Sequence, residues 1–428
     1  MKFREESMVY IRITPWRIIN DQIEALINGK IQISVDNNNV PITLYHPHLI
    51  NGKNGRLTRT NNRDVQYLII CPNEFFPIAQ KIANIHSIEV PLEHQLTTKI
   101  YTIEQIIETY NSYDTNYAIR EYLINQIVEN QSLIFLLLLG DEAHIPPILD
   151  AANNYPSDDY YTTPEIYNGD PQLVTGRIPI DNSNDANYVA NKIYDYIINP
   201  SPGLWRSKIA LVADDMYRSC SINNTQMERS HTIYTDNLFD FLNPFIPVIP
   251  YYGIHYDLQQ TAGCTQPDLT QDFIQTINGG IALINYIGHG DNQSWGDEKF
   301  ITKSRDLSLI HSEENKLAIW VAGTCSFGNY YENNSFMEEL LIKENGAIAI
   351  VATTDGINYT SNWNFLESLF GINNNDGIED FITNSHNYRL GELVWKAKNV
   401  NNSYKFHVFG DPALPLPFPK QNTNLINE

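Results

Sequence analysis

A histidine and a cysteine with the chemistry of a nucleophilic pair follow two apolar segments of the chain. His289 is flanked by glycines and follows the run 281–287, and Cys325 comes shortly after the run 317–321. A thiol with a pKa of about 8.5 is mostly protonated at neutral pH, so a neighbouring imidazole would raise its thiolate fraction and later protonate a leaving amine. The backbone N–H groups of Gly290 and Cys325 are candidate donors to an oxyanion.

The apolar segments predict that both side chains lie at one edge of a sheet. Continuous runs of Ile, Leu and Val are typical of parallel strands that are buried on both faces. Ligand sites in such sheets form beyond the carboxyl ends of the strands. The 36 positions from His289 to Cys325 leave room for one crossover helix, so we expect the two residues to be neighbours. The predicted strands are 67–71, 133–139, 209–212, 281–287, 317–321 and 347–352.

From the residues alone, a structural interpretation of this pair stays open. A free cysteine often behaves as a small buried hydrophobe, and His289 could simply close a strand end through hydrogen bonds. The four cysteines, Cys71, Cys220, Cys264 and Cys325, contain no CxxC pair. Their spacing therefore predicts neither a disulfide framework nor a structural zinc site.

Segments with helical periodicity separate the apolar runs, and this alternation predicts an α/β sandwich with right-handed crossovers. The helical spacing occurs within 103–110, 119–127, 189–197, 227–242 and 336–341. Residues 10–14 and 31–35 instead alternate apolar with polar, as half-exposed antiparallel strands do. The predicted organisation is a β-rich segment over 1–60, a first subdomain over 61–200, a second over 201–418 and a tail over 419–428.

The charge of the chain narrows the class of partner. Its 428 residues include 28 Lys and Arg against 50 Asp and Glu, a formal net charge of −22, so nucleic acids are poor candidates.

The longest apolar run, 133–139, is far shorter than the roughly 20 residues that cross a bilayer, and we expect no membrane span. The charged first residues lack the apolar stretch of a secretory signal, so the chain either stays inside the cell or has lost a leader.

Several motifs, in the same order along the chain, resemble those of the gingipain-type cysteine peptidases, which have a caspase-like fold. Residues 284–297 resemble the histidine block of that family and residues 321–328 its cysteine block. The nearest likeness is to the sortase-like relatives that process cargo of type IX secretion. The resemblance implies a three-layer α/β sandwich with a mostly parallel sheet in two subdomains. Further matches are 140–141, 176–179, 205–206, 213–215, 335–341, 346–354 and 409–414.

By this resemblance Cys325 is the nucleophile, His289 the general base and acid, and Gly290 with Cys325 the oxyanion hole. The family also uses an acidic residue that orients the histidine, and the matching region offers Glu142 or Asp141, although either could instead cap a turn. The implied activity is that of a cysteine endopeptidase acting through a thioester. The alternatives are a sortase-like transpeptidase and a non-catalytic binding or assembly module with the same fold.

The resemblance also suggests where substrate and ions bind. Asp158 or Asp159 matches the place of the residue that recognises a basic side chain in arginine- and lysine-specific relatives, although a solvated turn is an equal alternative. Trp295 is a candidate wall of that pocket or a core residue. No cofactor is expected for catalysis, whereas structural calcium is allowed at the acidic clusters 150–159, 214–215 and 291–297.

Family members usually have a leader, a prosegment and an immunoglobulin-like domain after the catalytic part. In this chain the short β-rich segment over 1–60 is a candidate remnant of a prosegment. We expect a peptide or protein substrate and a secreted or cell-surface location, with a cytoplasmic location as the alternative. The oligomeric state does not follow from the sequence.

Overall fold

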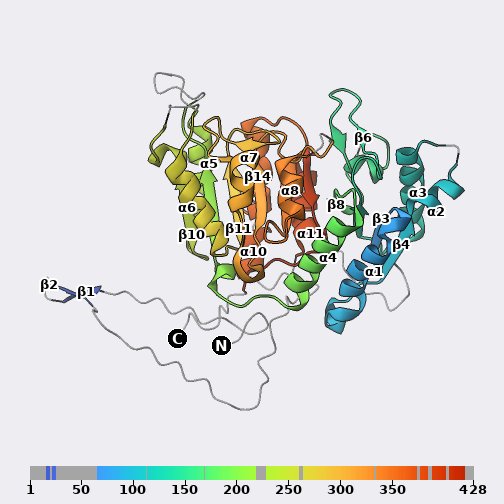
Figure 1. Ribbon diagram of the computed structural model, residues 1–428, viewed down its shortest axis with the longest axis horizontal. Helices are drawn as coiled ribbons and strands as arrows, with labels where there is room; N and C mark the ends of the chain where they lie inside the picture. Colours follow the sequence, from blue (N-terminus) through green and yellow to red (C-terminus); the bar gives the residue numbers. More distant parts are fainter. Residues whose placement is uncertain are drawn as a thin grey trace, which may run out of the picture.

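A single ten-stranded sheet forms the centre of the computed structural model, with the strand order β10-β9-β11-β14-β15-β16-β8-β5-β3-β4 (Figure 1). The structure describes residues 16–19, 22–25, 65–111, 113–167, 169–217, 228–259, 264–331, 334–373, 376–383, 388–401 and 404–419. The strands of the sheet are β3 (Tyr67–Cys71), β4 (Thr98–Thr102), β5 (Phe135–Leu139), β8 (Val174–Ile178), β9 (Ile209–Ala213), β10 (Val248–Tyr252), β11 (Leu283–Ile287), β14 (Ile319–Gly323), β15 (Ala349–Thr353) and β16 (Phe406–Phe409).

The sheet consists of two parallel halves that run in opposite directions. Neighbouring strands are parallel everywhere except at β15 and β16, which pair antiparallel. The carboxyl ends of β10, β9, β11, β14 and β15 therefore lie at one edge, and those of the other five strands lie at the opposite edge. All six predicted strands belong to this sheet. The subdomain boundaries stay predictions, and β16, from the predicted second subdomain, pairs with β8 of the first.

Helices cover both faces of the sheet (Figure 1). Ile209 and Leu211 of β9 belong to the core under α1, α4, α5, α9, α10 and α11, whereas Ala210 and Val212 belong to the core under α6 and α8. A third core lies under α2 and α3. Burial on both faces explains the continuous apolar runs and confirms the three-layer sandwich. The helices are α1 (Phe76–Asn84), α2 (Ile103–Thr109), α3 (Thr115–Glu129), α4 (Ser183–Ile198), α5 (Ser230–Leu242), α6 (Pro267–Asn278), α7 (Lys303–Asp306), α8 (Phe336–Ile342), α9 (Tyr359–Phe370), α10 (Ile378–Thr383) and α11 (Leu390–Asn401).

Six short strands form three further pairs outside the central sheet. β1 (Trp16–Ile19) and β2 (Gln22–Ala25) pair antiparallel, as do β6 (Ile148–Leu149) with β7 (Pro156–Ser157) and β12 (Ser294–Trp295) with β13 (Ile301–Thr302). The strands predicted at 10–14 and 31–35, like most of the segment 1–60 and of the tail, lie outside the described residues.

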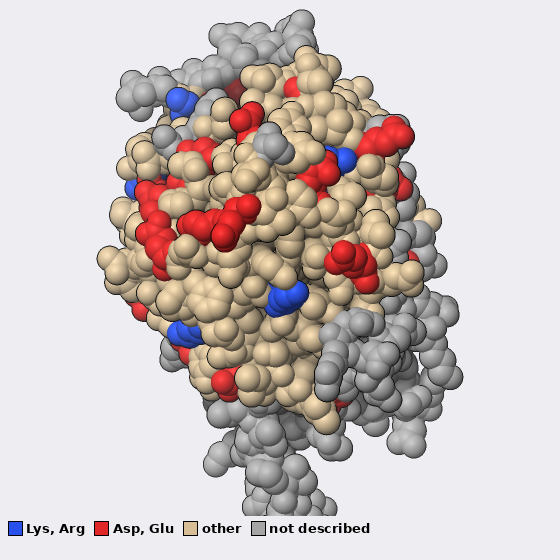
Figure 2. Space-filling model, turned by 90° about the vertical axis from the view of Figure 1, so that its right-hand side faces the viewer, with Lys and Arg blue, Asp and Glu red and all other residues tan. Residues whose placement is uncertain are grey.

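The surface agrees with the negative charge of the chain. Figure 2 shows the side of the molecule that carries α2 and α3, where clusters of Asp and Glu are more prominent than Lys and Arg. Among the helices that the structure describes, none has the length and the apolar character to cross a membrane.

The strand register places three chain segments at one point of the sheet edge. Ile287, the last residue of β11, lies opposite Gly323 of β14 on one side and Ala213 of β9 on the other. The residues that follow these strands therefore leave the sheet side by side. They include Asp214, His289 and Cys325.

Candidate active site

The glycines on either side of His289 are required by close packing. A Cβ atom at Gly288 would lie 2.2 Å from Oη of Tyr286 and 2.5 Å from Cβ of Asp214. At Gly290 it would lie 2.7 Å from Oγ1 of Thr324 and 2.8 Å from the carbonyl oxygen of Ser294. Side chains are thus excluded at both positions, and the loop can approach the end of β14 closely.

The backbone of His289 is held by two side chains from different strand ends. Its N–H donates to Oδ2 of Asp214 at 2.7 Å, and its carbonyl accepts the hydroxyl of Tyr286 at 2.6 Å. The same carbonyl accepts the N–H of Gly296 at 2.8 Å. Both polar groups of the His289 backbone are hydrogen-bonded, so the backbone that carries the imidazole is held in place.

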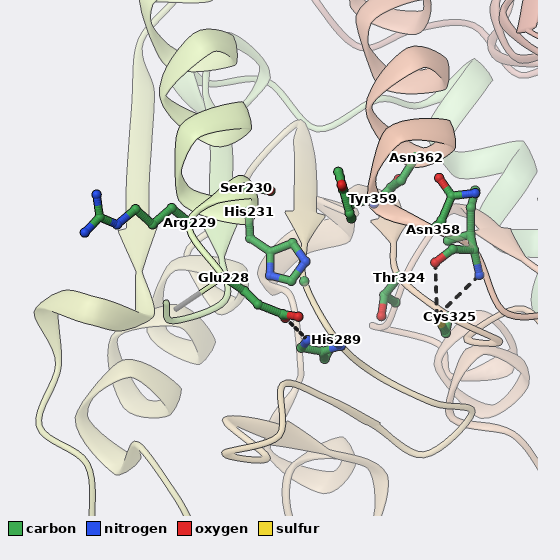
Figure 3. A pocket seen from close by; sticks show the side chains of 12 residues that line it. Glu228, Arg229, Ser230, His231, His289, Thr324, Cys325, Asn358, Tyr359 and Asn362 are labelled. Atoms are coloured by element: carbon green, nitrogen blue, oxygen red, sulfur yellow. Dashed lines mark hydrogen bonds and ion pairs between the residues drawn. The ribbon is translucent and has the colours of Figure 1, made fainter. Parts of the chain in front are cut away.

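A carboxylate orients the imidazole of His289. Nε2 of the ring lies 2.6 Å from Oε2 of Glu228, two residues before the start of α5 (Figure 3). The ring of His231, in the first turn of α5, lies 5.1 Å from that of His289 at 88°. Glu228 thus occupies one ring nitrogen of His289, and the other nitrogen is left for chemistry in the cavity.

The thiol of Cys325 lies across the same cavity. Sγ accepts the N–H of Ile357 at 3.4 Å and lies 3.5 Å from the Ile357 carbonyl. The next residue, Ser326, has a φ of 54°, an uncommon conformation for a residue with a side chain that often marks functional turns. Cys325 is half-buried and open to the cavity.

One cavity of about 380 Å³ joins these groups (Figure 3). Within the described part of the chain, the backbone N–H groups of Gly290 and Cys325 form no hydrogen bond, and their role as oxyanion donors stays a prediction. The cavity is lined by Glu228, Arg229, Ser230, His231, Gly288, His289, Thr324, Cys325, Ile357, Asn358, Tyr359 and Asn362.

Three buried carboxylates lie behind the histidine loop. One oxygen from each of Asp214, Asp215 and Glu298 lies within 4.8 Å of the others. Burial raises the pKa of Asp214 to about 7, and burial together with Asp214 raises the pKa of Glu298 to about 9. These oxygens are donors that calcium accepts, and calcium at 214–215 stays a prediction.

The other two acidic clusters use their carboxylates within the protein. Asp150 accepts the N–H groups of Ala152 and Asn153, and Asp291 accepts those of Gln293 and Ser294. These are turn interactions, and calcium at 150–159 and 291–297 stays a prediction.

Glu142 does not reach His289, and its predicted role is wrong. It lines a different cavity of about 540 Å³ together with Asp181 and Lys343. The physical reason is the strand direction: β5, which precedes Glu142, runs opposite to β11 and β14, so its carboxyl end lies at the other sheet edge. The alternative, Asp141, binds the ring of His144 at 2.6 Å.

Asp158 and Asp159 form buried ion pairs rather than a substrate pocket, so that prediction is also wrong. The carboxylate of Asp158 accepts Nε and a terminal nitrogen of Arg177, both at 2.7 Å, and the hydroxyl of Tyr330 at 2.9 Å. Asp159 accepts Nζ of Lys398 at 2.7 Å. Both carboxylates are almost fully buried, so neither can meet a substrate side chain or act as a solvated turn.

The pair of Asp158 and Arg177 should be a large contributor to stability. We expect Asp158→Asn to lower the free energy of unfolding by about 3–5 kcal/mol, because it leaves the buried guanidinium without its counter-ion. Urea unfolding followed by circular dichroism measures this, with the exposed Asp257→Asn as the matched control. Equal stabilities of the two variants would contradict the expectation.

Trp295 belongs to the core. Of its two predicted roles, pocket wall and core residue, the structure supports the second. The side chain is fully buried, and its ring stacks on that of Tyr286 at 4.5 Å and contacts Trp320 and Phe327. It therefore supports the strand that leads to His289 and does not wall the cavity.

Sequence reasoning missed Glu228 and His231 and considered Asp214 only as part of a calcium cluster. The only signal for Glu228 was its position at the start of the segment 227–242, which was predicted to be helical, and many surface residues share such a position. Cys264 is disulfide-bonded, a state that the cysteine spacing did not predict, whereas Cys71 is a buried free thiol.

Comparison with known proteins identifies similar chains. The sequence model of the family described as Peptidase family C25 matches residues 60–417 of this chain. Gingipain R2 of Porphyromonas gingivalis is 25% identical over 236 residues, which cover 53% of this chain but only 29% of that protein. An uncharacterized protein of Archaeoglobus fulgidus is 22% identical over 309 residues, which cover 67% of this chain and 72% of that one.

A solved structure shares the fold. The Arg specific cysteine proteinase gingipain R superposes with a TM-score of 0.63 and 18% identity, covering 83% of this chain and 79% of that one. At this identity the likeness supports the caspase-like arrangement of the sheet and helices and says nothing about specificity.

Proposed function

Because the chain belongs to peptidase family C25, we propose that it is a cysteine endopeptidase with Cys325 as nucleophile and His289 as general base and acid. The observation that carries the proposal is the shared cavity. Cys325 and His289 follow adjacent parallel strands, enter one cavity of about 380 Å³, and the imidazole is bound on its far side by Glu228.

The proposed reaction proceeds in two steps through a thioester. The Cys325 thiolate attacks the carbonyl carbon of the scissile peptide bond, and the N–H groups of Gly290 and Cys325 donate to the oxyanion. The C–N bond then breaks, and His289 gives its proton to the departing amine. In the second step His289 removes a proton from water, which attacks the thioester and releases the acid and the thiol.

Glu228 acts in this scheme as a positioning residue. At 2.6 Å from Nε2 it holds the ring so that the other nitrogen faces the cavity, and its charge stabilises the imidazolium that forms during acylation. It contributes no atom to the bonds that are made or broken.

The scheme uses only groups of the chain, and structural calcium remains a separate proposal. We also propose a secreted or cell-surface location, with a cytoplasmic one as the alternative. The support is the disulfide at Cys264, because disulfides persist mainly in oxidising compartments.

The cavity favours an uncharged residue before the scissile bond. Among the described lining residues, the one carboxylate, Glu228, already binds His289, and Asn358, Tyr359 and Asn362 lie on the side of Cys325 (Figure 3). A cationic side chain would lose its hydration there without gaining a free carboxylate partner. We expect peptides with Asn or Gln at this position to be cleaved at least ~10-fold faster than those with Arg or Lys.

A set of fluorogenic peptides that differ only at this position tests both the activity and the preference. A preference for Arg or Lys would contradict the expectation that the cavity accepts an uncharged side chain. The absence of any cleavage by folded protein would favour the binding module, and products that incorporate an added amine would identify a transpeptidase.

A further inference from the structure

Two imidazoles and a carboxylate meet at the end of β11. One ring nitrogen from each of His231 and His289 and one carboxylate oxygen of Asp214 lie within 4.8 Å of one another. They come from α5, from the loop after β11 and from the end of β9, and Figure 3 shows His231 above His289 in the cavity. Glu228 binds Nε2 of His289 at 2.6 Å and lies outside this group of three.

The proposed peptidase reaction does not use His231. Its side chain is 7% exposed, and its buried Nδ1 has no hydrogen-bond partner among the residues that the structure describes, which is costly for a polar group. A neutral imidazole nitrogen is a common metal ligand, so His231 is a candidate ligand residue.

We propose that His231, His289 and Asp214 form an inhibitory site for a borderline transition-metal ion such as Zn²⁺. Imidazole nitrogens and carboxylate oxygens are common zinc ligands, and a site with three protein ligands leaves a fourth position open. Calcium, which prefers oxygen donors alone, fits this set poorly.

Metal binding would stop catalysis by occupying His289. A ring nitrogen that coordinates an ion cannot accept the proton of the thiol or of water. This inhibitory consequence rests on the proposed function, whereas the binding of the ion does not. Binding and inhibition are therefore measured separately.

The direct test titrates zinc chloride into the chelator-treated full chain carrying Cys325→Ser, by calorimetry. Removing the thiol excludes a site made by Cys325 and His289 alone. We expect one zinc ion to bind, and His231→Asn to weaken its binding at least ~10-fold. His231→Gln is a second variant, thermal unfolding verifies the fold of each, and His311→Asn, which changes an exposed histidine outside the cavity, is the matched control.

Three results would overturn the proposal. They are zinc affinity that is unchanged in both His231 variants, zinc affinity lost in Glu298→Gln with His231 intact, and calcium chloride that displaces zinc at equal concentration. The last two would place the ion among the carboxylates of Asp214, Asp215 and Glu298. In the wild-type chain, zinc should inhibit cleavage and a chelator should restore it; an inactive chain that still binds zinc through His231 would refute only the proposed peptidase.

Discussion

Cys325→Ala is expected to abolish peptide cleavage while leaving the protein folded. Removal of a nucleophile that works together with its base costs roughly 10⁶-fold in kcat in a comparable hydrolase. The side chain is half-buried and bonds only the backbone of Ile357 among the described residues, so we expect the free energy of unfolding to change by less than ~1 kcal/mol. Cleavage of the best fluorogenic peptide and urea unfolding measure the two effects.

Cys71, the other free thiol among the described residues, provides the control for this prediction. Cys71 is fully buried in β3, and burial raises its pKa to about 12, so it should resist alkylation. Iodoacetamide should therefore modify Cys325 first, more slowly in His289→Ala, and Cys71→Ala should keep its activity. Equal labelling of the two thiols in the folded chain, or full activity of Cys325→Ala, would refute Cys325 as the nucleophile.

The parts of the fold that sequence reasoning predicted are those buried on both faces. β5, β11, β14 and β15 appear as continuous apolar runs because helices cover them on both sides. β4 lies at an edge and is partly exposed, and β10, at the other edge, contains Pro250, so neither shows this pattern. The antiparallel pairing of β16 with β15 depends on contacts between residues far apart in the chain, which no local sequence pattern encodes.

The part of the candidate site that follows predicted strands could be predicted, and the part that depends on the order and direction of the strands could not. His289 and Cys325 follow successive predicted strands, and the edge rule for parallel sheets places them together. Glu142 follows a strand of the same kind, but the reversal at β15 and β16 sends it to the opposite edge. Asp158 resembles a turn residue in sequence, and only the packing of Arg177 against it shows that it is a buried ion pair.

Glu228→Gln is expected to lower kcat by about 10²–10⁴-fold, because a neutral amide stabilises the imidazolium less and can hold the wrong tautomer of His289. Glutamine has nearly the same shape, so the loss should come without a change in thermal unfolding. The measurement is kcat and KM for the best fluorogenic peptide. A positioning role predicts that kcat falls while KM changes little.

Glu142→Gln is the matched control, since it makes the same chemical change at the opposite edge of the sheet. We expect it to leave kcat unchanged, and Glu228→Asp to recover part of the activity because the charge returns at a greater distance from Nε2. A role of Glu228 in fold alone would lower stability in both Glu228 variants and leave the rate per folded molecule intact. If Glu142→Gln were the variant that lost activity, the orientation of His289 by Glu228 would have to be abandoned.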